Sequence, residues 1–250
     1  MIIKDIYDFI DSFAPFSTQC EWDNAGLLVG DMNSVVNKIG FALDATAETV
    51  NSACENNCDL MITHHPVIFH PLKSVNLNNP VYKIIENKIS IICAHTNLDK
   101  SDKGVNRVLA ETIGLRNLSQ FESDNDSSMC FTGEIDEISG EDFSYLINSG
   151  LNTKCKYYSS GKEIRKVAVC GGAGGEFLYD IFDKCDAFIT GEVKHHEFLD
   201  AASLGLSIYE AGHYETEFPV MNNLKEAIEK KFEISCVLLN QSKPAVYCGD

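Results

Sequence analysis

Metal-type side chains follow three short apolar segments of this chain. The apolar residues predict that each segment is a buried strand. In open α/β sheets, ligands bind at the carboxyl ends of strands, which is where the following residues would lie. We therefore expect these side chains to converge at one sheet edge. The segments, each with the metal-type residues that follow it, are Leu60–Thr63 with His64 and His65, Ile91–Ala94 with His95 and Asp99, and Ile208–Ala211 with His213 and Glu217.

Imidazole and carboxylate groups together suit zinc, iron, manganese or cobalt rather than calcium. Adjacent strand residues point in opposite directions, so His64 and His65 would each bind one of two neighbouring ions. His213 and Glu217 are four residues apart and would share one face of a helix, and the Asp99 carboxylate could bridge two cations. We expect two divalent transition-metal ions per chain (zinc, iron or manganese), about 3.5–4 Å apart, which would hold a hydroxide nucleophile.

A single histidine at a strand end is usually a hydrogen-bonded structural residue. Here the three loops carry four of the seven histidines in the chain, which favours metal binding. His95 is the weakest ligand candidate, and we interpret it as a second-sphere or substrate-contacting catalytic imidazole. His196 follows the predicted strand Ala187–Thr190 and is either a proton-transfer group or a solvated residue at a helix start. Both interpretations of His196 remain open.

Other candidate residues point less directly to chemistry. The glycine-rich stretch Cys170–Gly175 lies between a predicted strand and a predicted helix, as a phosphate-binding loop would. It lacks the Gly-Lys-Ser/Thr motif and the third glycine of dinucleotide loops, so we favour a tight turn over phosphate contact. Trp22, the only tryptophan, is expected to anchor a loop beneath the site, while Glu21 and Asp23 could join a second sphere. His70 is interpreted as structural or exposed.

The elements that position these residues alternate along the chain. A one-sided helix over residues 2–13 comes first. Short apolar strands separated by helix-length connections then indicate parallel strands with crossover helices. The predicted strands are 38–43, 59–63, 90–94, 129–133, 154–158, 167–170, 187–190, 207–211 and 234–239, and the predicted helices are 48–56, 81–87, 104–113, 141–149, 176–183, 196–203 and 217–231. This is the pattern of an α/β protein.

The polar stretch from Asn117 to Ser128 indicates a domain boundary. We predict a metal-binding α/β domain from residues 1–118 together with 205–250, a linker over 119–125, and a second α/β domain over 126–204. Both domains should contain largely parallel sheets flanked by helices, with the metal site in the cleft between them.

Composition excludes several partners. With 37 acidic and 20 basic side chains the formal charge is −17, which argues against nucleic acids and anionic membranes. No apolar run approaches the roughly 20 residues of a spanning helix, and the N-terminus does not resemble a signal peptide. The ten cysteines include no Cys-x-x-Cys pair, so we expect reduced thiols in a cytoplasmic protein.

The chain resembles the family of GTP cyclohydrolase I type 2 homologues, or Nif-three-like proteins. The matching motifs are Trp22–Leu27, His64–Pro66, His95–Asp99, Gly171–Gly175, Ile189–Glu192 and Gly212–Glu217. The resemblance covers nearly the whole chain in order. It implies two α/β domains, a toroidal homohexamer and a dinuclear metal centre ligated by His64, His65, Asp99, His213 and Glu217. Some relatives carry an extra domain between the halves, for which this chain is too short.

These observations lead to one main hypothesis and two alternatives. The main hypothesis is a metal-dependent hydrolase acting on a nucleotide-like or small heterocyclic substrate, and the resemblance implies GTP ring opening. The first alternative is phosphoester hydrolysis at the same two metals. The second is a metal-binding hexamer that serves as a regulatory, storage or partner-binding scaffold.

Overall fold

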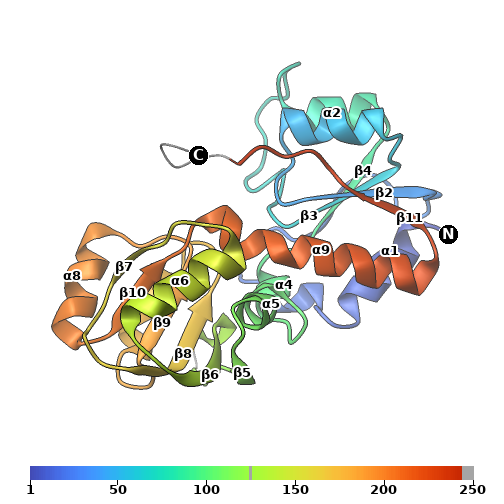
Figure 1. The fold of residues 1–250 in the computed structure, drawn as a ribbon. Helices are drawn as coiled ribbons and strands as arrows, with labels where there is room; N and C mark the ends of the chain where they lie inside the picture. The colour runs from blue at the N-terminus through green and yellow to red at the C-terminus, as the bar shows by residue number, and fades with distance from the viewer. Residues whose placement is uncertain (124–125, 244–250) are drawn as a thin grey trace. The chain divides into compact units, whose positions relative to one another are not determined.

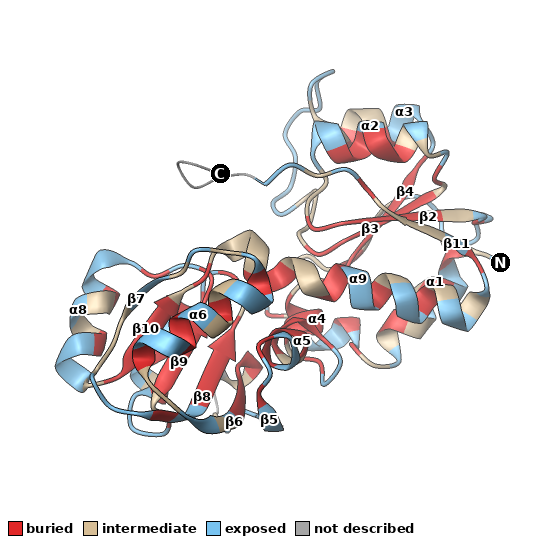
Figure 2. Ribbon diagram, viewed as in Figure 1, coloured by how far each residue is buried: buried red, intermediate tan, exposed pale blue. Residues whose placement is uncertain are grey.

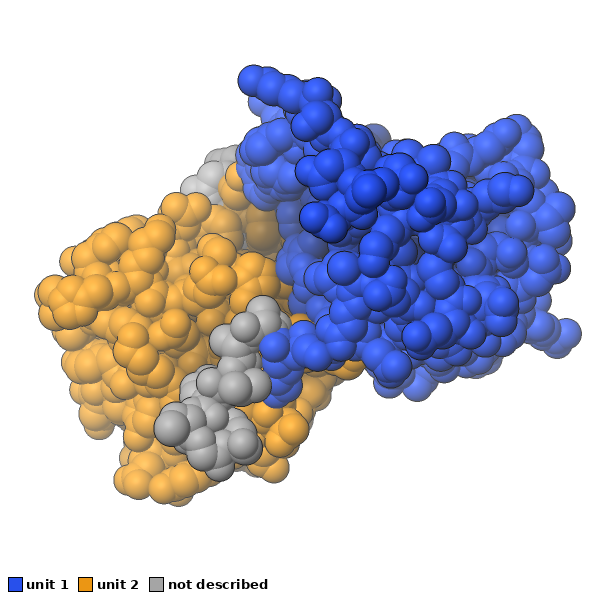
Figure 3. Space-filling view, turned by 90° about the horizontal axis from the view of Figure 1, so that it is seen from above, with its two compact units in different colours: residues 1–98, 220–244 blue, residues 99–219, 245–250 orange. Residues whose placement is uncertain are grey.

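The computed structural model describes residues 1–123 and 126–243. Its described residues form two compact units: unit 1 comprises residues 1–98 and 220–243, and unit 2 comprises the described residues of 99–219 (Figure 3). The chain leaves unit 1 inside the short helix α4 (Thr96–Asp99) and returns inside the long helix α9 (His213–Phe232). No helix in the described ranges is long and apolar enough to cross a membrane.

Unit 1 contains a five-stranded sheet among its described residues (Figure 1). Four strands are parallel, and β1 pairs antiparallel with β4 at one edge. In order across the sheet the strands are β1 (Gly26–Val29), β4 (Ser90–Cys93), β3 (Leu60–Thr63), β2 (Lys38–Ala42) and β11 (Ser235–Leu238).

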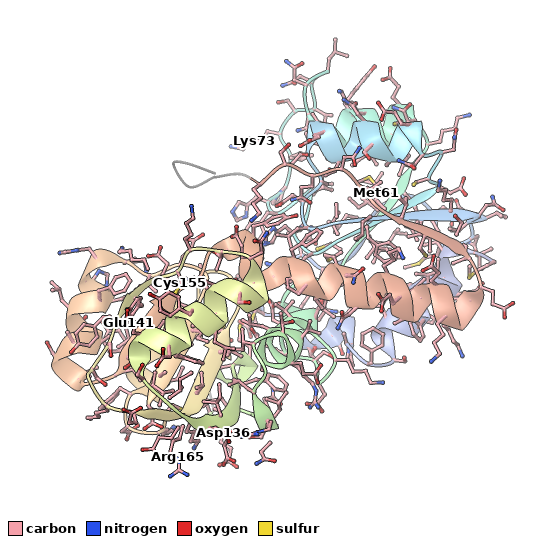
Figure 4. All side chains as sticks on the ribbon, viewed as in Figure 1. Met61, Lys73, Asp136, Glu141, Cys155 and Arg165 are labelled. Atoms are coloured by element: carbon pink, nitrogen blue, oxygen red, sulfur yellow. The ribbon has the colours of Figure 1, made fainter. Side chains whose placement is uncertain are left out.

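Helices cover both faces of this sheet (Figure 1). Val50 of α2 (Ala47–Glu55) and Ile84 of α3 (Pro80–Glu86) pack in one core cluster with Met61 of β3, which is labelled in Figure 4. On the other face, α1 (Ile3–Asp11) buries a stripe of isoleucines, as its one-sided sequence predicts, and Phe9 contacts Phe232 of α9. A short 3₁₀ helix, Phe16–Thr18, follows α1.

Unit 2 contains a six-stranded sheet within the described ranges. The order is β5 (Arg116–Gln120), β6 (Phe131–Ile138), β8 (Ile164–Cys170), β9 (Ala187–Thr190), β10 (Ser207–Glu210) and β7 (Lys156–Tyr158). β8, β9 and β10 run parallel to one another, whereas the β5–β6, β6–β8 and β10–β7 pairs are antiparallel. The expected largely parallel arrangement therefore holds for unit 1 but is wrong for unit 2.

The central strands of both sheets are buried, while the edge strands β5 and β7 and the outer helix faces are largely exposed (Figure 2). In unit 2, α5 (Val105–Thr112) and α6 (Gly140–Leu151) share one core cluster with the strands, and α8 (His195–Leu204) contacts β7 and β10. The remaining helical segments are α7 (Leu178–Ile181) and the 3₁₀ turns Asp126–Met129 and Gly175–Phe177. The α/β fold class is confirmed, and each helix and strand expected from sequence overlaps an observed one.

The observed division of the chain differs from the expected domains. The described part of the segment expected as a linker, 119–123, lies within unit 2, where β5 pairs with β6 as the edge strand of the sheet, and residues 124 and 125 lie outside the described residues. β10, expected in the metal-binding domain, pairs with β9 in unit 2. The edge strands β1 and β5 are additional to those predicted, and β5 lacks an apolar run because its residues are largely polar and exposed. None of the nine cysteines in the described part of the chain forms a disulfide.

Candidate metal-binding residues

Two neighbouring strands of unit 1 end in histidines. Thr63 of β3 lies opposite Cys93 of β4, so His64 and His65 leave the sheet beside His95. The rings of His64 and His65 have centroids 5.0 Å apart, and the ring of His95 lies 5.1 Å from His64 and 5.5 Å from His65. One ring nitrogen from each lies within 4.8 Å of those of the other two, so this histidine cluster could hold a metal ion.

Each ring of the histidine cluster is oriented through its Nδ1. The Nδ1 of buried His64 lies 2.8 Å from the carbonyl oxygen of Ala94. The Nδ1 atoms of His65 and His95 each lie 2.7 Å from a carboxylate, that of Asp44 and that of Asp23 respectively. When Nδ1 donates to an acceptor, Nε2 of a neutral imidazole carries the lone pair. Metal-binding histidines usually have this arrangement, so the cluster suits a transition-metal ion.

The two carboxylates are themselves held in place. Gln241 donates from Nε2 to Asp44 Oδ2 at 2.7 Å. Asp23 accepts from the backbone N–H of Thr96 at 3.0 Å and from its hydroxyl at 2.5 Å. Burial alone would raise the pKa of Asp23, but the hydrogen bonds from His95 and Thr96 and the charge of His95 outweigh it and lower this pKa to about 2. Asp23 therefore stays ionised beside the His95 ring.

Unit 2 holds a second group of metal-type residues. Helix α9 begins at His213, just after β10, and His213 Nε2 lies 3.1 Å from Glu217 Oε2 one turn later. Its Nδ1 lies 2.6 Å from Glu192 Oε1, so His213 is oriented in the same way as the cluster of unit 1. Glu217 is buried, as is Asp99 at the end of α4. This unit therefore contains an oriented imidazole and two buried carboxylates.

The thiol of Cys170, at the end of β8, is affected by the charges of both carboxylates. Its thiol pKa is raised first by a hydrogen bond with Cys130 and by burial, and further by the negative charges of Asp99 and Glu217. Both carboxylates are therefore near the same buried thiol within unit 2.

The glycine-rich loop after β8 packs directly against His213 and Glu217. Gly172 has φ +65°, and a Cβ at this position would lie 2.3 Å from Glu217 Oε1 and 3.3 Å from His213 Nε2. The backbone N–H of Gly172 also donates to the Thr216 hydroxyl at 3.1 Å. Glycine at position 172 therefore permits both the left-handed backbone and the close approach, as expected for a tight turn.

Two expectations about the site need correction. The strands that precede the candidate ligands do not belong to one sheet: β3 and β4 lie in the sheet of unit 1, and β10 lies in the sheet of unit 2. Trp22 does not lie beneath the site, because the residue is 54% exposed. His196 is exposed in the first turn of α8, as its interpretation as a solvated helix-start residue predicted, and it belongs to neither metal-type group found among the described residues. His70 is exposed, as one of its two interpretations predicted.

Sequence reasoning missed two carboxylates that orient histidines. Asp44 follows β2 and Glu192 follows β9, so both lie near strand carboxyl ends, like the histidines themselves. Examining every strand end, and not only those followed by histidine, would have found both. Their pairing with particular rings could not be predicted, because His65 and Asp44 are 21 residues apart, as are His213 and Glu192.

The fold and these residues define an α/β protein with histidine–carboxylate groups of the kind that bind transition metals. The family described as Duf34/NIF3 (NGG1p interacting factor 3) matches residues 1–244. The chain therefore belongs to the Duf34/NIF3 family.

Individual relatives match along almost their whole length. A protein of Clostridium perfringens named "GTP cyclohydrolase 1 type 2 homolog" is 30% identical over 93% of each chain. The crystal structure of Staphylococcus aureus protein SA1388 superposes with a TM-score of 0.90, at 28% identity over 99% of each chain. The structure titled "Reduced HcgD from Methanocaldococcus jannaschii" gives a TM-score of 0.85 at 29% identity, covering 96% of this chain and 98% of that one.

Proposed function

We propose that the protein is a metal-dependent hydrolase that adds water to a nucleotide-like or other small heterocyclic substrate. The observation that carries this proposal is the shared orientation of the histidines. His64, His65, His95 and His213 each place Nδ1 against a carbonyl or carboxylate oxygen, as metal-binding and proton-transferring imidazoles do. The name of the Clostridium relative suggests GTP as the first substrate to test.

The proposed ligands of two divalent ions are His64 and His65 of unit 1 and Asp99, His213 and Glu217 of unit 2. Their nitrogen and oxygen donors suit zinc, iron or manganese. When bound, such ions lower the pKa of water to supply a hydroxide nucleophile at neutral pH, and they polarise the group under attack.

His95 is proposed to exchange a proton with water or substrate at Nε2. Its Nδ1 lies 2.7 Å from Asp23, whose lowered pKa keeps a negative charge beside the ring. A buried carboxylate stabilises the imidazolium that forms when Nε2 takes up a proton, and it also holds the ring in one orientation. Asp23 is therefore a positioning residue for His95.

Metal content and turnover measured together test this function. Purified wild type should contain stoichiometric transition metal, by inductively coupled plasma mass spectrometry, and hydrolyse at least one member of a nucleotide and heterocycle panel. We expect His64→Ala to lower both metal content and rate at least tenfold. His195→Ala removes an exposed histidine of unit 2 that belongs to neither metal-type group among the described residues, and it should leave both unchanged.

Other results would redirect the proposal. Cleavage confined to phosphoester bonds would support the phosphoesterase alternative. Stoichiometric metal without turnover on any compound would support a metal-binding scaffold. Less than one metal per chain under metal-replete conditions would contradict the site itself.

A further inference from the structure

Two exposed aromatic rings stand beside the histidine cluster of unit 1. Trp22 is 54% exposed and Phe69 is 40% exposed, so neither ring is buried in the core. The centroid of the Trp22 ring lies 6.0 Å from that of Phe69, with the planes at 46°, and 6.1 Å from that of His95. We call Trp22 and Phe69 the aromatic pair. The aromatic pair therefore lies on the surface of unit 1, next to the ring of His95.

The loop that carries Trp22 is fixed on both sides of the ring. On one side, the Cys20 N–H donates to the Thr96 hydroxyl at 2.9 Å. On the other side, the Asp23 carboxylate is hydrogen-bonded to both His95 and Thr96. Trp22 is therefore positioned by the same contacts that orient the imidazole of His95.

The loop that carries Phe69 is tied to the Trp22 loop. Asn24 donates from its side-chain amide to the carbonyl oxygen of Ile68 at 2.6 Å, and Ile68 directly precedes Phe69. Lys73, four residues after Phe69 and labelled in Figure 4, is exposed. The Asn24 contact therefore holds the two rings of the pair near each other on an open surface. Rings held in advance lose little conformational entropy when they bind a ligand.

We propose that the aromatic pair binds the planar ring of a nitrogen heterocycle, such as a purine, and presents it to His95. This inference rests on the proposed function and specifies how its substrate is held. Stacking on an aromatic side chain accepts any base, because every base has a π face, and it contributes strongly to the binding of that base. It also suits a chain with a formal charge of −17, which gains little affinity from the anionic part of a nucleotide.

The sole tryptophan makes this binding directly observable. Guanosine should quench the fluorescence of Trp22 in a saturable way, because it would stack on the indole ring. Ribose 5-phosphate, which has a sugar and phosphate but no heterocycle, should cause no quenching. Both titrations are made on the metal-loaded full chain.

Equilibrium dialysis with guanosine extends the test to variants that lack the tryptophan. Trp22→Ala should weaken binding about tenfold or more, and Phe69→Ala should weaken it by a smaller factor. Trp22→Tyr keeps an aromatic face and should stay within about threefold of wild type. Tyr145→Ala removes an aromatic ring that is 61% exposed on α6 of unit 2, and it should bind as wild type does. Circular dichroism of each variant checks that the fold is retained.

Several results would overturn the inference. These are guanosine binding without quenching, quenching by ribose 5-phosphate, wild-type affinity in Trp22→Ala, or the absence of any guanosine binding. Failure of the proposed function is recognised separately, from metal content and turnover in the same samples. If Trp22→Ala keeps its metal and hydrolyses substrate with an unchanged KM, the proposed function is supported. The proposal that the aromatic pair binds the substrate is then contradicted.

Discussion

Carboxylates behind the imidazoles are the main residue-scale feature of this protein. Three histidines form a hydrogen bond through Nδ1 to a carboxylate, that of Asp23, Asp44 or Glu192. Each hydrogen bond leaves the Nε2 of the ring facing away from the carboxylate. Such partners fix both the tautomer and the orientation of a ring. The reactivity of these histidines thus depends on residues that would not themselves touch a metal or substrate.

Asp23 should make the stability of the protein depend on pH in the acid range. Its folded-state pKa is about 2, below the ordinary value of 3.8, so its ionised form stabilises the fold above about pH 4. That contribution is lost as the pH falls through 2. We expect Asp23→Asn to lower the free energy of unfolding by about 1.5–3 kcal/mol at pH 7, because charged hydrogen bonds are removed. The difference from wild type should shrink between about pH 4 and pH 2.

Urea denaturation of metal-free protein from pH 2 to pH 7 measures this difference. Asp183→Asn removes an exposed carboxylate and serves as the control, with little effect on stability at pH 7. A gap between wild type and Asp23→Asn that stays constant down to pH 2 would show that the Asp23 carboxylate is not the group responsible.

At the scale of elements, the turn after β8 and the start of α9 act together. The glycine loop approaches so closely that Gly172 leaves no room for a side chain beside Glu217. The i, i+4 spacing of His213 and Glu217 then places both on the face of α9 that meets the loop. A glycine-rich turn between a strand and a helix thus packs here against candidate metal ligands.

Gly172→Ala should displace the Glu217 carboxylate as well as strain the backbone. The added Cβ would lie 2.3 Å from Glu217 Oε1 at φ +65°. We expect a loss of at least about 2 kcal/mol in unfolding free energy and a lower metal content. Gly161→Ala is the matched control, because Gly161 has φ +78° with nothing within 4 Å of the added Cβ, and it should cost about 1 kcal/mol.

Thermal denaturation and metal analysis of both variants distinguish the two effects. Equal destabilisation of the two variants with unchanged metal content would mean that only backbone strain matters at position 172.

At the scale of the whole molecule, the candidate ligands are divided between two units with separate sheets and cores. Each unit supplies oriented imidazole, and unit 2 adds the buried carboxylates. The formal charge of −17 includes Asp99 and Glu217. If both bind divalent cations, as proposed, the formal count overstates the negative charge of the working protein.

The whole chain is expected to assemble as a homohexamer, as the family resemblance implies. Unit 2 exposes apolar side chains that subunit contacts would bury, including Tyr179, Phe182 and Leu199. Multi-angle light scattering should therefore give six times the mass of one chain. Leu199→Asp, in an exposed position of α8, should give a smaller species without loss of secondary structure by circular dichroism. A monomeric wild type would contradict the expected assembly.

Most helices and strands, and the residue types that follow the strands, could be predicted from the sequence. Apolar runs and the residues after them are local properties, so His64, His65, His95 and His213 could be recognised as candidates from the strand pattern alone. The polar edge strand β5 escaped prediction because it buries no apolar face that periodicity could reveal.

The sheet that each strand joins, and the acceptor that meets each imidazole, follow from the folded arrangement of the chain. β10 pairs with β9 in unit 2, and a sequence of alternating strands and helices does not specify the order of strands across a sheet. Likewise, Asp23 meets His95 across 72 residues of chain. Contacts between distant segments depend on the folded order of strands, and therefore they cannot be read from spacing along the chain.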